Sequence, residues 1–321
     1  MKPASSQRVP RLWLVSPIYL DVESFLMLHE KLGLAFTHAP LSAGQLKFLL
    51  VDDTAGLDPD ISRLSKLEDV RVVTPPFNLG HQRAIVFGLR SISQEIDPDD
   101  VIITLDADGE DRPEDLNRML EPLAADLGDR GRVVLARRVR RRESLSFKLL
   151  YAMFRALFVL LTGLVVRTGN FAAFRGWFVQ NVLFHPSFDL CYSSTLLSLN
   201  RPLIFVPCER GERYAGESRM GYLKLFIHGI RMLMPFLDRI AVRSLIGFSL
   251  TFGVGVVLAT AIVFIRLFTD LAIPGWATYT LLLIVLLSFI ALGNFIILFA
   301  LFSQSQSISM SFLDRGRNEG A

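Results

Sequence analysis

The sequence predicts an α/β domain built on a parallel sheet, followed by a membrane hairpin of two helices. Before residue 143, short β-branched apolar segments alternate with helical patterns, which is the rhythm of βαβ units. Two long uncharged apolar stretches then follow Arg243. The 321 residues are 51% hydrophobic and 20% charged, with a mean hydropathy of +0.40. That is too apolar for one ordinary soluble domain of this length.

The net charge excludes a uniformly basic nucleic-acid binder, because 34 Lys and Arg residues face 31 Asp and Glu residues and leave only +3. Two cysteines in unrelated contexts, Cys191 and Cys208, imply no disulfide framework, and we expect both to be reduced packing residues. The N-terminus carries no long apolar run before a cleavage-type site, so we expect no signal peptide and a cytoplasmic globular part.

The strands and helices of the α/β domain are predicted from these alternating segments. The expected strands are Leu12–Val15, Phe48–Val51, Val70–Val73, Val101–Leu105 and Val133–Leu135. The expected helices lie near Val22–Leu34, Gln82–Ile92 and Pro113–Leu123. Pro113 suits the first turn of the last helix, and the acidic residues after it suit the positive end of the helix dipole.

The two uncharged stretches are long enough to cross a bilayer. Ser244–Ile265 would span roughly 33 Å as a helix, and Trp276–Phe302 is longer. Two buried core helices of a soluble protein are the alternative. Arginines precede the first stretch and follow the second (Arg239, Arg243, Arg315 and Arg317), whereas the connecting turn carries Arg266. The positive-inside rule therefore predicts that both termini are cytoplasmic.

Two basic apolar segments are expected to be helices at the membrane surface or, alternatively, core helices of the soluble domain. They are residues 144–166 and residues 219–239. The arginine run 137–142 would meet anionic head groups or a phosphate, or else be a solvated charge run. The expected organisation is a domain over 1–218 that includes 144–166, a juxtamembrane helix over 219–239, a two-span segment over 240–303 with spans at about 244–266 and 276–302, and a tail over 304–321.

Acidic clusters follow two of the predicted strands, where ligands bind in parallel sheets. Asp52 and Asp53 follow one strand, and the block from Asp106 to Asp111 follows another. Crowded carboxylates favour a divalent cation, and Mg²⁺ is usually held by one or two carboxylates plus substrate phosphates. For Asp111 a helix N-cap is the alternative role. Arg137, Arg138 and the glycine-containing segment 210–219 are candidates for holding the phosphates, although the segment also reads as a plain exposed loop.

At these residues the sequence resembles inverting family 2 glycosyltransferases with a GT-A fold, of the polyprenyl-phosphate type that includes dolichol-phosphate mannose synthases and bactoprenol glucosyltransferases. The ordered motifs that carry the resemblance are Pro17-Ile18-Tyr19, Val51-Asp52-Asp53, Asn78-Leu79-Gly80 with Ala84 and Gly88, the DXD block 105–115, Gly169-Asn170-Phe171 with Phe174-Arg175, and the run from Arg213 to Arg219. The resemblance covers essentially the whole chain.

The resemblance implies a role for each matching residue. The nucleotide sugar would lie against Pro17, Tyr19, Asp52, Asp53, Asn78, Gly80, Gln82, Asp106 and Ala107. Mg²⁺ or Mn²⁺ would be held by Asp106, Asp108 and Glu110. The acceptor phosphate would contact Arg137, Arg138, Arg213, Ser218 and Arg219, and the catalytic group would be Asp106, Asp108, Asp111, Asn170 and Arg213. His81 is interpreted as structural or donor-adjacent rather than as a catalytic base.

Three positions depart from the family pattern. Tyr-Asn-Glu is Tyr19-Leu20-Asp21 here, Asp-Gly-Ser is Asp53-Thr54-Ala55, and Gly-Asp-Phe is Gly169-Asn170-Phe171. The last change removes a carboxylate that is sometimes assigned as the catalytic base. A lipid phosphate is mostly dianionic at pH 7 and serves as its own nucleophile, so this acceptor needs no base.

The hypothesis from sequence is therefore a glycosyltransferase of the inner membrane. It would move a sugar from a UDP- or GDP-sugar to a polyprenyl phosphate by metal-assisted single displacement with inversion. One alternative is transfer to a hydroxyl of another lipid or glycan, which would need a base such as Asp111. Another is a non-catalytic membrane partner that keeps the fold. The partners are the donor, the lipid and the membrane, and the family also contains homo-oligomers.

Overall fold

The computed structural model describes residues 10–37, 44–125, 128–138, 145–166, 168–215, 222–269 and 275–305. Contacts divide the chain into two compact units. The first comprises Met1–Ala152 and Val166–Pro235, and the second comprises Met153–Val165 and Phe236–Ala321. The domain limits expected from sequence, with a boundary after residue 218, stay a prediction.

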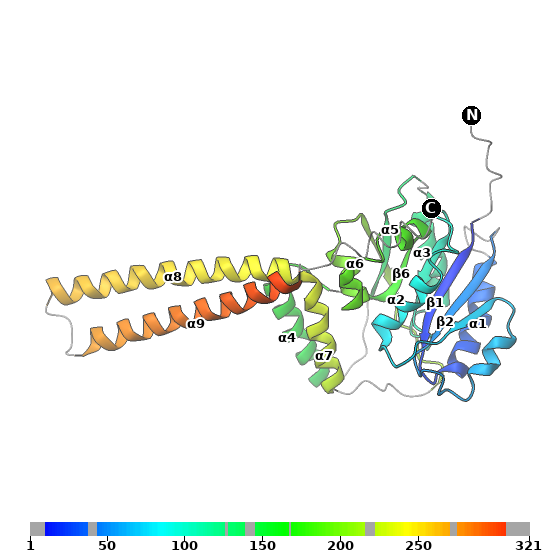
Figure 1. Cartoon of the computed structure of the whole chain (residues 1–321), viewed down its shortest axis with the longest axis horizontal. Coiled ribbons are helices and arrows are strands. Elements are labelled where there is room, and N and C mark those ends of the chain that lie inside the picture. Colours follow the sequence, from blue (N-terminus) through cyan, green and yellow to red (C-terminus); the bar gives the residue numbers. More distant parts are fainter. Residues whose placement is uncertain are drawn as a thin grey trace. The chain divides into compact units, whose positions relative to one another are not determined.

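The first unit is built on a seven-stranded sheet with the order β3-β2-β1-β4-β6-β5-β7 (Figure 1). Its strands are β1 (Leu12–Ile18), β2 (Leu46–Asp52), β3 (Val70–Val73), β4 (Val101–Thr104), β5 (Val133–Arg138), β6 (Thr168–Arg175) and β7 (Leu203–Cys208). The α/β fold with a two-helix C-terminal hairpin is confirmed. The five expected strands are present, whereas β6 and β7 were not predicted.

The five predicted strands run parallel to one another, as expected, and the antiparallel strand is β6, which the sequence did not predict. β1 pairs in parallel with β2 and β4, but β6 runs antiparallel to both β4 and β5. Apolar periodicity shows that a strand is buried and does not show its direction, because direction depends on how the chain returns to the sheet. Here the excursion through the long helix α4 (Leu145–Thr162) ends by inserting β6 in the opposite sense.

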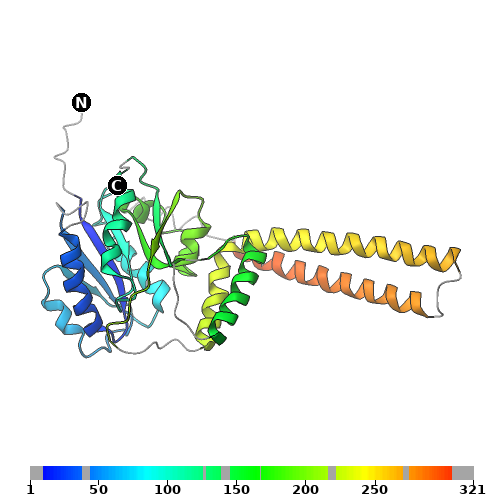
Figure 2. The same cartoon turned by 180° about the vertical axis from the view of Figure 1, so that it is seen from behind.

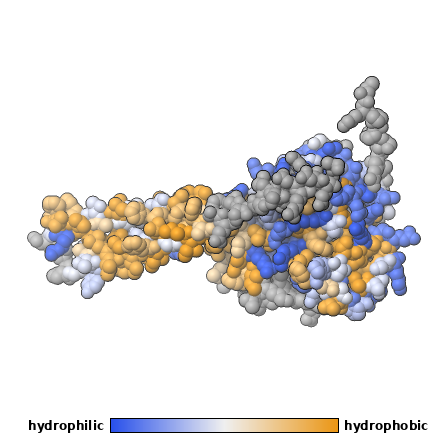
Figure 3. Space-filling model, in the orientation of Figure 1, coloured by the Kyte–Doolittle hydropathy of each residue, from blue (hydrophilic) through white to orange (hydrophobic). Residues whose placement is uncertain are grey.

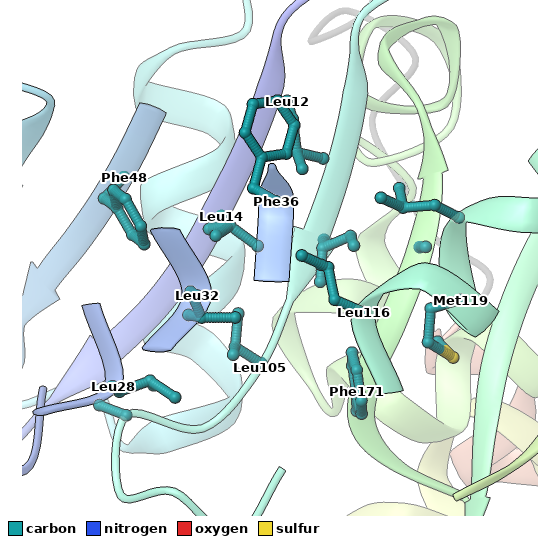
Figure 4. Packing of buried hydrophobic residues seen from close by; sticks show 14 of the residues in the cluster. Leu12, Leu14, Leu28, Leu32, Phe36, Phe48, Leu105, Leu116, Met119 and Phe171 are labelled. Carbon is teal, nitrogen blue, oxygen red and sulfur yellow. The ribbon is translucent and has the colours of Figure 1, made fainter. Parts of the chain in front are cut away.

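Helices cover both faces of the sheet, as Figure 2 shows from behind. On one face α1 (Val22–Phe36) and α3 (Leu116–Ala125) pack on alternate residues of β1, such as Leu12 and Leu14 (Figure 4). The other face receives α2 (His81–Ser91), which packs on β1, and α5 (Gly176–Asn181) and α6 (Tyr192–Ser198), which pack on β6. Because β1 is buried on both faces, its sequence is a nearly continuous apolar run rather than an alternating one.

Shorter elements complete this unit. They are the 3-10 helices η1 (Ile61–Lys66), η2 (Pro113–Asp115), η3 (Pro186–Asp189) and η4 (Met234–Phe236, divided between the two units), and the helix α7 (Tyr222–Leu233). Cys191 and Cys208 are both buried and unpaired, which confirms their assignment as packing residues.

A buried ion pair joins the amino ends of β1 and β4. The carboxylate of Asp100, which is 1% exposed, accepts hydrogen bonds from the backbone N–H of Arg11 at 2.8 Å and from its guanidinium at 2.7 and 3.0 Å. Asp100 also accepts the N–H of Asp97 at 3.0 Å. This network lies at the edge of the sheet opposite to the acidic loop that follows β4, so it holds the two central strands together without touching the site.

The second unit contains two long apolar helices, α8 (Leu237–Phe268) and α9 (Trp276–Ser305). Two stretches, Leu225–Phe268 and Trp276–Leu301, are long and apolar enough to span a membrane. The surfaces of α8 and α9 are mostly hydrophobic in Figure 3. The helices contact each other closely, because Phe248 stacks on Phe295 and a Cβ on Gly255 would lie 3.2 Å from Ile284. Exposed apolar surface on this scale is typical of a lipid-facing hairpin rather than of buried core helices.

The last turns of α4 belong to this second unit. Phe158 is fully buried and meets Phe236 edge to face, with ring centroids 5.4 Å apart. Arg243 donates to the carbonyl of Leu160 at 3.1 Å, so a cation caps the C-terminal end of α4. Met153, Leu157 and Leu160 of α4 are exposed, and the surface role expected for this helix stays a prediction.

Candidate active site

The site lies where the carboxyl ends of β1, β2 and β4 meet the start of the antiparallel strand β6. In the ladder between β4 and β6, Thr104 pairs with Ala172, so the residues two positions further out are Asp106 and Asn170. Their side chains meet, because Asn170 Nδ2 donates to Asp106 Oδ1 at 3.1 Å. Thr104 strengthens the junction by donating to the backbone carbonyl of Asn170 at 2.6 Å. Strand register therefore fixes the spacing of these two groups.

The acidic loop, defined as residues 106–111, is folded by its own carboxylates. Asp111 Oδ2 accepts the backbone N–H of Asp106 at 3.0 Å, and Asp108 Oδ1 accepts that of Glu110 at 2.9 Å. Asp111 is buried and its other oxygen lies 3.3 Å from Arg138. Helix η2 begins only after Arg112, so the alternative that Asp111 is a helix N-cap was wrong. Ala107 is buried within the loop.

Asp106 is surrounded by donors. His81 Nε2 lies 2.9 Å from Asp106 Oδ1, and an Arg138 nitrogen lies 3.9 Å from Oδ2. Desolvation raises the pKa of Asp106, but the charges of His81 and Arg138 outweigh it and hold this pKa below its ordinary value. Desolvation likewise opposes the charged form of His81, and Asp106 reverses that effect, so the pKa of His81 is raised. Asp106 is therefore ionised at neutral pH.

A second segment covers the acidic loop. We call residues 209–215 the covering segment. Its backbone bonds the loop at two points, since Gly211 N donates to Glu110 O at 2.8 Å and Tyr214 N to Asp108 O at 2.9 Å. Two arginines of this segment meet the predicted metal ligands. Arg210 contacts both oxygens of Glu110 at 2.6 to 3.0 Å, and Arg213 contacts Asp108 Oδ2 at 2.5 Å.

Glycine is required where these two segments touch. Gly109 has φ of +86° and a Cβ there would lie 2.5 Å from the ring of Tyr214. Gly56 has a similar φ of +82°, but its Cβ would meet a single atom at 3.9 Å. The close approach of Tyr214 is thus specific to Gly109.

Replacing Gly109 by alanine is expected to destabilise the protein more than replacing Gly56. Both changes carry the cost of a left-handed backbone, about 1 kcal/mol, and Gly109→Ala must also displace Tyr214. Thermal unfolding of the two variants measures the difference. Equal losses would show that Tyr214 does not pack on the loop.

Carboxylate crowding leaves uncompensated negative charge in the loop. Burial, together with the charge of Asp106, raises the pKa of Asp108 to about 6 and that of Asp111 to about 7. The arginines oppose this rise without cancelling it. The loop is therefore a place where an added cation would be stabilised.

Replacing Asp111 by asparagine is expected to change how stability depends on pH. A carboxyl whose pKa is raised on folding contributes stability that is complete below its unfolded pKa, near 4, and is lost as pH rises through its folded pKa. For Asp111 that loss falls between about pH 4 and pH 7. The melting temperature of Asp111→Asn, measured against wild type, should therefore improve from pH 5 to about pH 7 and level off above it. A difference that is constant with pH would contradict the assignment.

The residues expected to bind the nucleotide follow β1, β2 and β3. Asp53 Oδ1 accepts the N–H of Leu79 at 2.7 Å, and Asn78 donates to the carbonyl of Asp53 at 2.8 Å, so two of the motifs are joined. Asp52 is fully buried and its oxygens accept bonds from Thr54 and Gly56, which places its carboxylate in the turn itself. Tyr19 is 45% exposed, whereas Pro17 lies in β1, whose residues are all buried. Gly80 has φ of +76° at the start of α2.

Gln82 joins the site to the helix behind it. Its amide donates to Asn170 Oδ1, and its oxygen accepts the N–H of Ser193 at 2.9 Å. Tyr192 of the same helix contacts Thr104 at 2.9 Å. Sequence reasoning missed Ser193 and Tyr192, included Arg210 only within a phosphate-binding segment, and interpreted His81 as structural or donor-adjacent. The pairing of β6 with β4, which places Asn170 beside Asp106, is the feature that would have identified these residues.

The structure describes three of the five residues that were expected to hold the acceptor phosphate. Arg138 is half-buried beside Asp106 and Asp111, whereas Arg137 is exposed on the same strand. Ser218 and Arg219 lie outside the described residues. Arg213 belongs to the site through Asp108.

The residues present fit a cation that is shared with phosphates. Within the residues that the structure describes, no three His, Cys, Asp or Glu side chains form a group able to hold a metal. Mg²⁺ nevertheless commonly takes only one or two carboxylates and completes its shell with phosphates and water. Asp106 and Asp108 supply hard oxygen donors, and burial together with the neighbouring charge of Asp106 raises the pKa of Asp108.

Part of the chain matches a known protein family. Residues 40–180 match the model of glycosyl transferase family 2. The matched region includes Asp53, Asn78, the acidic loop, Arg138 and Asn170. β1, the covering segment and the apolar hairpin lie outside that region.

Solved structures show distant likeness. The S. aureus TarS fragment 1–349 is 14% identical, with coverage of 71% of each chain and a TM-score of 0.40. The same fragment in complex with UDP is 14% identical, with coverage of 73% of this chain and 65% of that one, also at 0.40. A 4-diphosphocytidyl-2C-methyl-D-erythritol synthase is 13% identical, with coverage of 71% and 99% and a TM-score of 0.38. No curated protein matches the chain.

Proposed function

We propose that this protein transfers a sugar from a nucleoside-diphosphate sugar to a polyprenyl phosphate at the cytoplasmic face of a membrane. The observation that carries the proposal is the pairing of Asn170 with Asp106 in a family 2 domain. The amide of Asn170 takes no proton at neutral pH, so an acceptor that needs no base suits this site. The apolar hairpin supports an acceptor that resides in a bilayer.

The chemistry assigned to the chain is positioning and charge stabilisation. The acceptor phosphate oxygen attacks the anomeric carbon while the bond to the nucleoside diphosphate breaks, and this single displacement inverts the centre. A divalent cation held by Asp106, Asp108 and Glu110 would supply charge neutralisation for the departing diphosphate. Arg138 and Arg213 provide bidentate donors for phosphate oxygens. Asp53 and Asn78, joined through one turn, would hold the nucleoside.

Transfer to a hydroxyl is the second candidate, and one observation favours it. His81 contacts Asp106 through Nε2, which is the arrangement of an imidazole oriented by a carboxylate. Asp111, the base expected for this alternative, is poorly placed, because its two oxygens bond Asp106 N and Arg138. A hydroxyl acceptor would therefore depend on His81.

The deciding experiment offers the full chain in detergent a panel of UDP- and GDP-sugars together with either a short polyprenyl phosphate or the matching polyprenol, in Mg²⁺ or Mn²⁺ and in a chelator. Formation of a metal-dependent lipid-linked sugar with inverted configuration from the phosphate supports the proposal. A product from the polyprenol alone, lost in His81→Ala, would support the second candidate. A folded protein that binds no donor would favour a non-catalytic partner.

A further inference from the structure

The covering segment occupies the carboxylates that a cation would need. Asp108 Oδ1 accepts the N–H of Glu110, and Arg213 lies 2.5 Å from the other oxygen, Oδ2. The Asp108 side chain is 10% exposed and that of Arg213 is 25% exposed, so this is a half-buried ion pair. Such charge-assisted bonds are about twice as strong as neutral ones.

The proposed cation would bind Asp108 and the proposed phosphate would bind Arg213, so both compete with the ion pair that these two residues form. A guanidinium in direct contact with a carboxylate oxygen disfavours a divalent cation at that oxygen, because the two positive charges repel at this separation. A guanidinium paired with Asp108 likewise lacks its full set of donors for a phosphate. Separation of the pair would therefore favour both cation binding at Asp108 and phosphate binding at Arg213.

We propose that Arg213 is the resting counter-ion of Asp108, and that a divalent cation arriving with the donor displaces it, so that Arg213 reaches the acceptor phosphate only afterwards. The inference rests on the proposed function and adds an order of binding to it. The donor and its cation bind first, and the acceptor phosphate binds to the arginine that they release.

The surrounding contacts allow the side chain to move while the backbone stays. Tyr214 N remains bonded to Asp108 O, the Tyr214 ring covers Gly109, and Lys31 lies 4.2 Å from the centre of that ring. The side chain of Arg213 has a second carboxylate within reach, because Asp21 Oδ1 lies 3.9 Å away. The exchange is thus a rotation of one long side chain rather than an opening of the covering segment.

The test measures cation affinity with neither donor nor acceptor present. Mn²⁺ is titrated into the full chain in detergent and free Mn²⁺ is followed by electron paramagnetic resonance. Arg213→Gln is expected to bind Mn²⁺ about tenfold more tightly than wild type, because the competing internal cation is gone. Arg213→Lys keeps the charge and is expected to behave as wild type. A purely phosphate-binding arginine would leave Mn²⁺ affinity unchanged.

Arg112→Gln is the matched control. It removes the same charge from an exposed pair with Glu114 and Glu209 next to the acidic loop. Its Mn²⁺ affinity should stay at the wild-type value. The proposal is overturned if Arg213→Gln binds Mn²⁺ no more tightly than wild type, or if Arg112→Gln gains as much. Thermal unfolding of each variant confirms that it is folded.

A second measurement tests the order. Titration of farnesyl phosphate into wild type is expected to show binding about tenfold tighter with saturating Mn²⁺ than without it, and Arg213→Gln is expected to lose that dependence. If the affinity of wild type for farnesyl phosphate does not depend on Mn²⁺, the proposed order of binding is overturned. These readouts need no product, so absence of sugar transfer with an intact Mn²⁺ effect would refute the acceptor assignment and leave the counter-ion role standing.

Discussion

Replacing Asp108 by alanine is expected to lower the rate of sugar transfer by about a thousandfold. The change removes a carboxylate of the acidic loop and with it a ligand for the cation that neutralises the leaving diphosphate. It also relieves repulsion, since burial and the charge of Asp106 raise the pKa of Asp108. The variant is therefore expected to stay folded. The measurement is the initial rate with the donor and lipid that the panel identifies, at saturating Mn²⁺.

Glu114→Ala is the control for this prediction. Glu114 lies three residues beyond the acidic loop, is exposed and contacts Arg112. Its loss should leave the rate within a factor of two or so of wild type, because exposed ion pairs contribute little. An Asp108→Ala enzyme that keeps most of its activity would remove Asp108 from the catalytic group.

The second large effect concerns stability. Asp100→Ala is expected to cost about 3–5 kcal/mol of unfolding free energy, because it leaves the buried guanidinium of Arg11 without its partner carboxylate. The backbone N–H groups of Arg11 and Asp97 lose their acceptor as well. Urea denaturation of the detergent-solubilised chain, followed by the fluorescence of Trp13 and the other tryptophans, measures the change.

The adjacent residue supplies the comparison. Asp99 is half exposed and pairs with Arg130 at 2.9 Å, so Asp99→Ala should cost no more than about 1 kcal/mol. Similar losses in the two variants would mean that the pair between Arg11 and Asp100 contributes no more than a surface contact.

Much of the fold was predictable because local patterns match it. β3 runs from Val70 to Val73 as predicted, and α1 begins at Val22 as predicted. In β3 and α1, the residue types at the ends of the element match the places where the element begins and ends. The two long apolar helices were predictable for a similar reason, since length and lack of charge are local properties.

The direction of β6 was not predictable from such patterns. Ala172 and Ala173 are small and buried, but nothing in the alternation tells which neighbour they pair with or in which sense. The site shows the same limit. Asp106 and Asp108 were identified from the strand before them, whereas the pairing of Arg213 with Asp108 joins residues 105 positions apart and depends on how the chain returns over the loop.

The register between β4 and β6 has a consequence for how such proteins diversify. Asn170 is held by the ladder and by Thr104, and it is not held by the 30 or so residues that separate β5 from β6. That excursion, which includes α4, is therefore free to change in length, composition and lipid preference over evolutionary time without moving the reacting groups. A lineage could exchange α4 and keep the pairing of Asn170 with Asp106.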